Sequence, residues 1–256
     1  MSTPALWRDL RRFTTARVAL GRVGHGQPTT AHLDFQEAHA LARDAVWSEL
    51  DTDALAASIA SLGLTVRRVA SEAPDRHTYL RRPDLGRSLR AADRDALLTE
   101  RRRGCLALVI ADGLCASGVQ IQAPAVLASL LPRLREAGWD IGPVVVAWQA
   151  RVALGDDIGE ALGAAAVAVL IGERPGLSSL DSMGIYLTWA PRRGRTDAER
   201  NCISNIRAAG LKPAEAAGKL LWLLAAARRL AATGIALKDE QPAQLEGSAA
   251  PAIEPG

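Results

Sequence analysis

The sequence predicts an α/β fold in which a mainly helical N-terminal region precedes a Rossmann-like, largely parallel sheet flanked by helices. Three continuous apolar runs, at residues 106–111, 144–149 and 167–171, carry this prediction. Strands that are covered by helices on both faces need unbroken apolar runs, whereas half-exposed strands alternate apolar and polar residues. Segments with helical periodicity separate the runs, and such alternation of strand and helix is typical of parallel sheets.

The region 104–237 contains the remaining elements of this α/β unit. One helical pattern covers residues 154–163, and the run GIYLTW that follows a loop predicts a further strand. A last helix has Pro213 in its first turn and Gly234 past its end, which is the usual placement of these two residue types. We therefore assign residues 104–237 to a single α/β domain.

Residues 1–103 are expected to be mainly helical. Apolar residues at helical spacing predict a helix over residues 35–50, with Asp34 as its N-cap. A second, short helix is expected at residues 53–62, and residues 64–71 are consistent with a single strand.

Two segments resist assignment to regular structure. Residues 70–90 contain Pro74, Pro83 and Gly86 and have no clear periodicity, which predicts a structured loop. Residues 238–256 have too little apolar content to order themselves, and we expect a disordered tail.

The composition is that of a globular protein, with 48% hydrophobic and 23% charged residues among 256. Nucleic acid is not an expected partner, because the net charge is only +3 and an aromatic content of 4% leaves no stacking platform for bases. No apolar run could span a bilayer, and charged residues come too early for a secretory signal, so we expect a cytoplasmic protein without a membrane partner. The three cysteines form no CxxC pair, which predicts buried free thiols.

Polar and glycine residues follow the three predicted parallel strands. Asp112 and Gly113 follow the first strand, residues 149–152 the second and residues 173–176 the third. The carboxyl ends of parallel strands lie at one edge of a sheet, where α/β proteins bind ligands. Glycine lets a ligand approach the backbone, and Glu173 can accept hydrogen bonds from amide or hydroxyl groups.

On the residues alone, less specific interpretations remain open. Glu173 and Arg174 are also compatible with a surface ion pair at a turn, and Val152 with simple packing. Cys202 lies in the polar segment RTDAERNCISNI, whose Asn and Ser side chains are also suited to satisfying the backbone of a loop.

The sequence contains few established catalytic patterns. It has no Walker A run, no HExxH and no GxSxG, and the glycines near residues 21–26 are spaced wrongly for a dinucleotide fingerprint. His32 and His39 would share a helix face only if the helix began before Asp34, so a metal pair is not expected. We predict neither a catalytic residue nor a metal ligand in this chain.

Seven segments together resemble the small (light) subunit of adenosylcobalamin-dependent ethanolamine ammonia-lyase. The resemblance covers about residues 9–238 and rests on LRRFTTARVALGR, DFQEAHALARDAV, DRHTYLRRPDLGR, VIADGL, QARVALGDDIGEALGA, VLIGERPGLSS and RTDAERNCISNI. It implies that the chain helps to bind adenosylcobalamin at the interface with a barrel-shaped large subunit, where ethanolamine is converted by radical chemistry to acetaldehyde and ammonia. The chain would then be active only in a hetero-oligomer, since the cofactor supplies the radical chemistry.

The resemblance also implies particular site residues. Carried over through matching motifs, the cofactor contacts are Val152 in QARVALGD, Glu173 in IGERPG and Cys202 in RNCISNI. It further implies that the N-terminal region contacts the large subunit, and that the protein is cytoplasmic or enclosed in a bacterial microcompartment.

Three alternatives are weighed against this interpretation. The run from Asp75 to Leu80 nearly matches the Asp-x-His-x-x-Gly signature of domains that ligate cobalt through histidine, but Leu80 replaces the glycine, so His77 is not expected to be a ligand. The other two are a binding or assembly module without a cofactor, which fits the Arg-rich N-terminal half, and a self-contained nucleotide-binding enzyme, which fits a parallel sheet.

Overall fold

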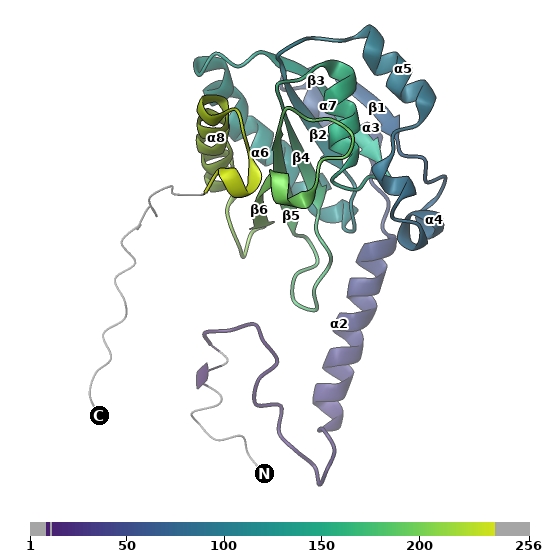
Figure 1. Cartoon of the computed structure of the whole chain (residues 1–256). Helices are drawn as coiled ribbons and strands as arrows, with labels where there is room; N and C mark the ends of the chain where they lie inside the picture. Colours follow the sequence, from purple (N-terminus) through teal and green to yellow (C-terminus); the bar gives the residue numbers. More distant parts are fainter. Residues whose placement is uncertain (1–8, 11, 239–256) are drawn as a thin grey trace, which may run out of the picture.

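A six-stranded sheet forms the centre of the protein, and helices cover both of its faces (Figure 1). The structure is a computed structural model that describes residues 9–10 and 12–238. The strands run in the order β1-β3-β2-β4-β5-β6 and are β1 (Val66–Ala70), β2 (Leu106–Ala111), β3 (Ile141–Trp148), β4 (Ala166–Gly172), β5 (Met183–Trp189) and β6 (Arg200–Ile206). The helices are α2 (Thr29–Trp47), α3 (Thr52–Ala60), α4 (Arg76–Arg81), α5 (Ala91–Thr99), α6 (Ala116–Glu136), α7 (Leu154–Leu162) and α8 (Pro213–Leu230).

The prediction of an α/β fold is confirmed. The expected Rossmann-like, largely parallel sheet is not confirmed, because the sheet is mixed. Strands β1, β3, β2 and β4 are parallel, whereas β5 and β6 run antiparallel to their neighbours. A parallel connection needs a crossover of a dozen or more residues, usually with a helix. Residues 173–182, between β4 and β5, contain no helix and are too few for such a crossover.

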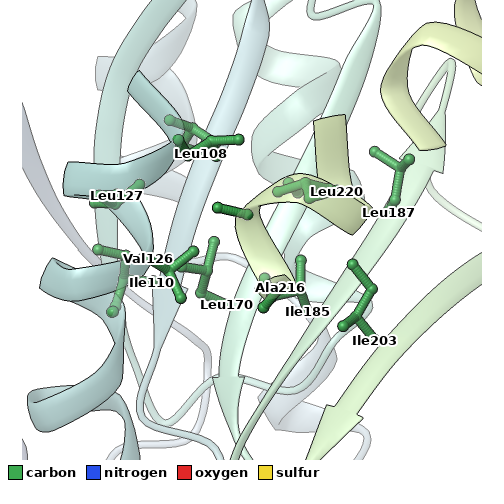
Figure 2. Close-up of a cluster of buried hydrophobic side chains, with 14 of the residues drawn as sticks. Leu108, Ile110, Val126, Leu127, Leu170, Ile185, Leu187, Ile203, Ala216 and Leu220 are labelled. Carbon is green, nitrogen blue, oxygen red and sulfur yellow. The ribbon is translucent and has the colours of Figure 1, made fainter. Parts of the chain in front are cut away.

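The central strands are buried because helices pack on both sides of them. Every residue of β2 and β4 is buried. One face packs against α3, α6 and α8, and Figure 2 shows side chains of this layer from the sheet, α6 and α8. The other face packs against α5 and α7.

Helix α7 approaches the sheet closely because its side chains are small where it touches β4 and the loop after β5. A Cβ atom on Gly155 would lie 2.2 Å from Val169 Cγ2, and one on Gly159 would lie 2.5 Å from Pro191 Cγ. The helix ends at Gly163, which adopts the left-handed conformation with a φ of 71°.

Helix α2 extends away from the sheet and its covering helices (Figure 1). Its buried residues are two alanines, Ala31 and Ala38, whereas large apolar side chains remain exposed. It begins at Thr29 after Pro28, so the expected N-cap at Asp34 is wrong. The expected start missed this first turn because its Thr, Ala and His residues give no apolar pattern.

The segment expected to be a loop at residues 70–90 contains α4 and a short 3₁₀ turn at Leu85–Arg87. Asp75 caps α4, accepting a hydrogen bond of 2.7 Å from the Thr78 N–H. These elements were missed because six helical residues are too few to establish a periodicity.

Strand β1 pairs with β3, so residues from the N-terminal region take part in the same sheet as the elements after residue 104. The disordered tail expected at residues 238–256 lies outside the described residues, apart from Lys238. Within the described ranges, the structure has no helix that is both long and apolar enough to cross a membrane.

Candidate functional site at the carboxyl edge of the sheet

A pocket of about 440 Å³ lies at the carboxyl ends of β2 and β4. The chain leaves β2 toward β3 on one side and leaves β4 toward β5 on the other, and crevices form where adjacent strands part in this way. The pocket is lined by Tyr79, Gly113, Leu114, Arg151, Val152, Ile171, Gly172, Glu173, Arg174 and Tyr186.

Glycine residues bring the ends of β2 and β4 into backbone contact at the floor of this pocket. A Cβ atom on Gly113 would lie 2.2 Å from the Gly172 carbonyl oxygen, and one on Gly172 would lie 2.1 Å from the Cys115 carbonyl oxygen. The Leu114 N–H donates a 3.0 Å hydrogen bond to the Gly172 carbonyl. No other residue type fits here without moving the backbone.

The buried carboxylate of Asp112 joins the end of β2 to the chain that follows β3. It accepts hydrogen bonds of 2.9 Å from the N–H groups of Gly113, Gln149 and Ala150. Burial raises the pKa of Asp112, while these N–H groups and Arg76 act in the opposite direction. The contact fixes Gln149, whose φ is 51°, and thereby fixes the start of the segment that carries Arg151 and Val152.

Arg151 lines the pocket and stacks on the buried ring of Tyr79. Its Cζ atom is 4.2 Å from the ring centroid, and its Nη2 donates a 3.2 Å hydrogen bond to the Tyr79 carbonyl. The Tyr79 hydroxyl in turn donates to the Ala150 carbonyl at 3.1 Å. Burial raises the pKa of Tyr79, so the phenol stays neutral at physiological pH.

Glu173 lines the same pocket and comes immediately after β4. Its carboxylate accepts a 2.5 Å hydrogen bond from the Ser182 hydroxyl and 3.2 Å hydrogen bonds from the Asn205 N–H. Among the described residues Glu173 has no ion pair with Arg174, so a surface pair at a turn does not account for its position. A carboxylate with this support keeps lone pairs available for a ligand.

Cys202 lies beside the pocket on β6, where it is paired with Tyr186 of β5. Partial desolvation raises the pKa of the Cys202 thiol, and the Glu173 carboxylate adds to the rise. Desolvation, Cys202 and Glu173 together raise the pKa of Tyr186 to about 12. Cys202 itself is exposed, whereas Cys105 and Cys115 are the buried free thiols expected.

Val152 and Glu173 thus line one pocket, and Cys202 contacts a residue that lines it. Two further pocket residues, Tyr79 from α4 and Tyr186 from β5, were not predicted. A signal was present, because these are the only two tyrosines in the chain.

The histidines do not form a metal site in the described part of the chain, where no group of three or more His, Cys, Asp or Glu could hold a metal ion. His32 and His39 do share α2, but His32 bonds Gln36 and His39 stacks on Phe35. His77 is exposed in the first turn of α4. It lines neither this pocket nor a second cavity, whose lining includes Arg76 and Asp112.

Comparison with known proteins identifies the family. Residues 4–238 match the family model for the ethanolamine ammonia-lyase light chain (EutC). The chain belongs to the ethanolamine ammonia-lyase light-chain family.

Relatives in this light-chain family match almost from end to end. The chain is 55% identical over 252 residues to the ethanolamine ammonia-lyase small subunit of Rhodopseudomonas palustris, covering 97% of this chain and 96% of the relative. It is 55% identical over 246 residues to the small subunit of Bradyrhizobium diazoefficiens, covering 94% of each. The small subunit of Azotobacter vinelandii is 51% identical over 247 residues, covering 94% of this chain and 92% of the relative. All six strands and the pocket therefore lie within the part that defines the family.

Proposed function

We propose that this chain is the small subunit of an ethanolamine ammonia-lyase and that its pocket binds part of adenosylcobalamin at the interface with a large subunit. The observation that carries the proposal is that Glu173 and Arg151 line one pocket, within a family of light chains. A hydrogen-bond acceptor and a donor in the same pocket suit a ligand that offers both kinds of group.

The residues present fit a corrinoid in this role. Cobalamin carries amide side chains around its ring, and each amide both donates and accepts hydrogen bonds. Glu173 is suited to amide N–H groups, Val152 supplies an apolar wall, and Cys202 supports Tyr186 from the neighbouring strand. A pocket of about 440 Å³ takes only part of so large a cofactor, which supports a binding site shared with a second chain.

The chain's contribution is to hold the cofactor and to help exclude water. When bound, adenosylcobalamin supplies the radical chemistry that converts ethanolamine to acetaldehyde and ammonia. Substrate binding and turnover then depend on the large subunit, so the chain is active only in the hetero-oligomer. The proposed location is the cytoplasm, or a bacterial microcompartment within it.

The subunit contacts are proposed to involve α2 and the segment from Asp75 to Arg87. Helix α2 exposes Leu33, Phe35, Leu41 and Trp47 to solvent, and exposed apolar groups at this density are typical of surfaces that another chain covers. Arg82 is already paired with Asp84 and Arg76 with Asp112, which leaves Arg81 and Arg87 as the guanidiniums of the segment without an ion pair among the described residues.

The test is the variant Glu173→Gln in the complex co-expressed with its large subunit. Removing the charge should weaken charge-assisted hydrogen bonds by on the order of 1–3 kcal/mol, a roughly tenfold to hundredfold loss of cobalamin affinity. The visible spectrum of the purified complex, titrated with cobalamin, measures this affinity. Glu100→Gln is the matched control, because Glu100 pairs with Arg67 away from the pocket.

Three outcomes would contradict the proposal at different points. A complex that binds no cobalamin would favour an assembly module, and unchanged affinity in Glu173→Gln would remove Glu173 from the site. Ethanolamine turnover by the purified chain alone, with adenosylcobalamin added, would show that the large subunit is not required.

A further inference from the structure

We infer that Arg151 is a second polar contact of this pocket and donates hydrogen bonds to an acceptor oxygen of the cofactor, either an amide carbonyl or a phosphodiester oxygen. This inference rests on the proposed function. It concerns a residue that neither the family resemblance nor the relatives' names assign to the site.

The Arg151 guanidinium has unused donors. It carries five N–H groups, and within the described residues its hydrogen-bond acceptor is the Tyr79 carbonyl alone. No carboxylate forms an ion pair with it in the same part of the chain. Its Nη1 group has no partner among those residues either and, unlike Nε, is not fully buried, so a ligand in the pocket can reach it. A ligand oxygen there would give these donors the partner that the chain does not supply.

The guanidinium is also held in place before any ligand arrives. It stacks on the Tyr79 ring, and the Arg151 N–H donates a 2.8 Å hydrogen bond to the Gly86 carbonyl. A Cβ atom on Gly86 would lie 3.0 Å from Arg151 Cγ and from the Tyr79 ring, so glycine leaves room for the stack. A side chain that is already ordered loses little entropy on binding.

The chemistry of the pocket indicates what Arg151 would bind. Glu173 can only accept hydrogen bonds and Arg151 can only donate them, so a ligand that contacts both must offer donors to Glu173 and oxygens to Arg151. Cobalamin offers oxygens of two kinds, the carbonyls of its amides and the phosphodiester of its nucleotide loop. A planar guanidinium suits both and pairs with a phosphodiester through two parallel bonds.

The experiment compares two corrinoids in the co-expressed complex. Cobalamin has both kinds of oxygen, whereas cobinamide keeps the amides and lacks the phosphodiester of the nucleotide loop. Affinities are measured by spectroscopic titration of the wild type, Arg151→Gln, Arg151→Lys and Arg103→Gln, with thermal unfolding of each complex as a check of folding. Arg103 is exposed just before β2, outside the pocket, so its variant reports any general effect of removing a positive charge.

We expect Arg151→Gln to lose cobalamin affinity roughly tenfold or more, with a smaller loss in Arg151→Lys and little change in Arg103→Gln. A loss for cobalamin alone identifies the phosphodiester as the partner, and a loss for both corrinoids identifies an amide carbonyl.

Two results would overturn the inference. One is unchanged affinity for both corrinoids in a folded Arg151→Gln complex, and the other is an equal loss in Arg103→Gln, which would indicate a general charge effect. If Arg151→Gln does not fold, Arg151→Lys decides in its place, because lysine cannot reproduce the planar fork and must bind more weakly. Failure of the wild-type complex to bind cobalamin would instead contradict the proposed function.

Discussion

Arg200 and Arg151 are both arginines of the α/β domain, but their hydrogen bonding differs. Arg200 bonds both Asp156 carboxylate oxygens at 2.7 Å, and its remaining donors reach Thr188, Asp197 and the Arg195 carbonyl. Within the described part of the chain, Arg151 reaches one carbonyl, and its Nε has no partner. A guanidinium that stabilises the fold uses its donors within the chain, whereas one that serves a ligand keeps some of them free.

Residues that line the pocket and residues that bind the fold-stabilising arginines lie in one short stretch of sequence around the start of α7. Arg151 and Val152 line the pocket, whereas Asp156 and Asp157, only a few residues later, face the interior of the domain. Asp157 accepts two hydrogen bonds from Arg193, at 2.6 and 2.7 Å, and one from the Leu89 N–H. The QARVALGDDIGEALG segment therefore combines residues that contribute to the pocket with residues that hold α7 in place.

The largest expected effect is on the buried ion pair. Arg200→Met would leave the Asp156 carboxylate buried without its partner, because both side chains are almost fully buried. Breaking such a pair typically costs about 3–5 kcal/mol. We expect a drop of this size in the free energy of unfolding, measured by urea denaturation of the complex. If Arg200→Met were as stable as Arg151→Gln, the distinction between the two arginines would be wrong.

A smaller effect is expected for Arg193→Gln, because Asp157 keeps Arg94 and the Leu89 N–H as partners. Arg193 is 58% exposed, so solvent screening limits the loss to about 1 kcal/mol.

Burial acts to raise the pKa of Asp157, but hydrogen bonds from Arg193 and Leu89 lower it below its ordinary value. A lowered carboxyl pKa stabilises the fold above the unfolded value of about 3.9 and loses that effect as the pH falls. The difference between wild type and variant should therefore shrink below about pH 4 in urea titrations at several pH values.

The smallest effect on stability is expected for Arg81→Ala combined with Arg87→Ala. Both side chains are exposed and have no ion pair among the described residues, so the free energy of unfolding should change by less than about 0.5 kcal/mol. Association with the large subunit should weaken severalfold, as measured by size-exclusion chromatography of dilute complex over a range of salt. Arg82→Ala is the matched control, since Arg82 is already paired with Asp84. Equal behaviour of control and double variant would remove this segment from the interface.

Much of the fold could be predicted because the central strands are buried on both faces. The apolar runs at 106–111 and 167–171 correspond closely to β2 and β4. Strand β6 was missed since an edge strand needs few apolar residues: its buried positions are Arg200, Ile203 and Ile206, and polar residues lie between them. The antiparallel direction of β5 follows from a short connection, a feature that apolar periodicity does not report.

The candidate site could be predicted only in part, for a related reason. Asp112, Val152 and Glu173 follow β2, β3 and β4. These strands are parallel neighbours in the sheet, so strand order alone brings the three residues to one edge. Tyr79 reaches the pocket from α4, and its position depends on contacts with Ala150 and Arg151 more than 70 residues later in the chain. Contacts between residues so far apart in the chain produce no periodic pattern in the sequence.

The pairing of β1 with β3 has a consequence for the order in which the chain folds. Strand β1 hydrogen-bonds to no strand except β3 in the described sheet, and β2 and α6 lie between them in the sequence. During synthesis β1 therefore leaves the ribosome long before β3 does. Its backbone N–H and C=O groups are hydrogen-bonded to water until β3 is available. Closing so long a loop delays pairing, which makes this edge a late step of folding and the part of the sheet most open to mispairing during synthesis.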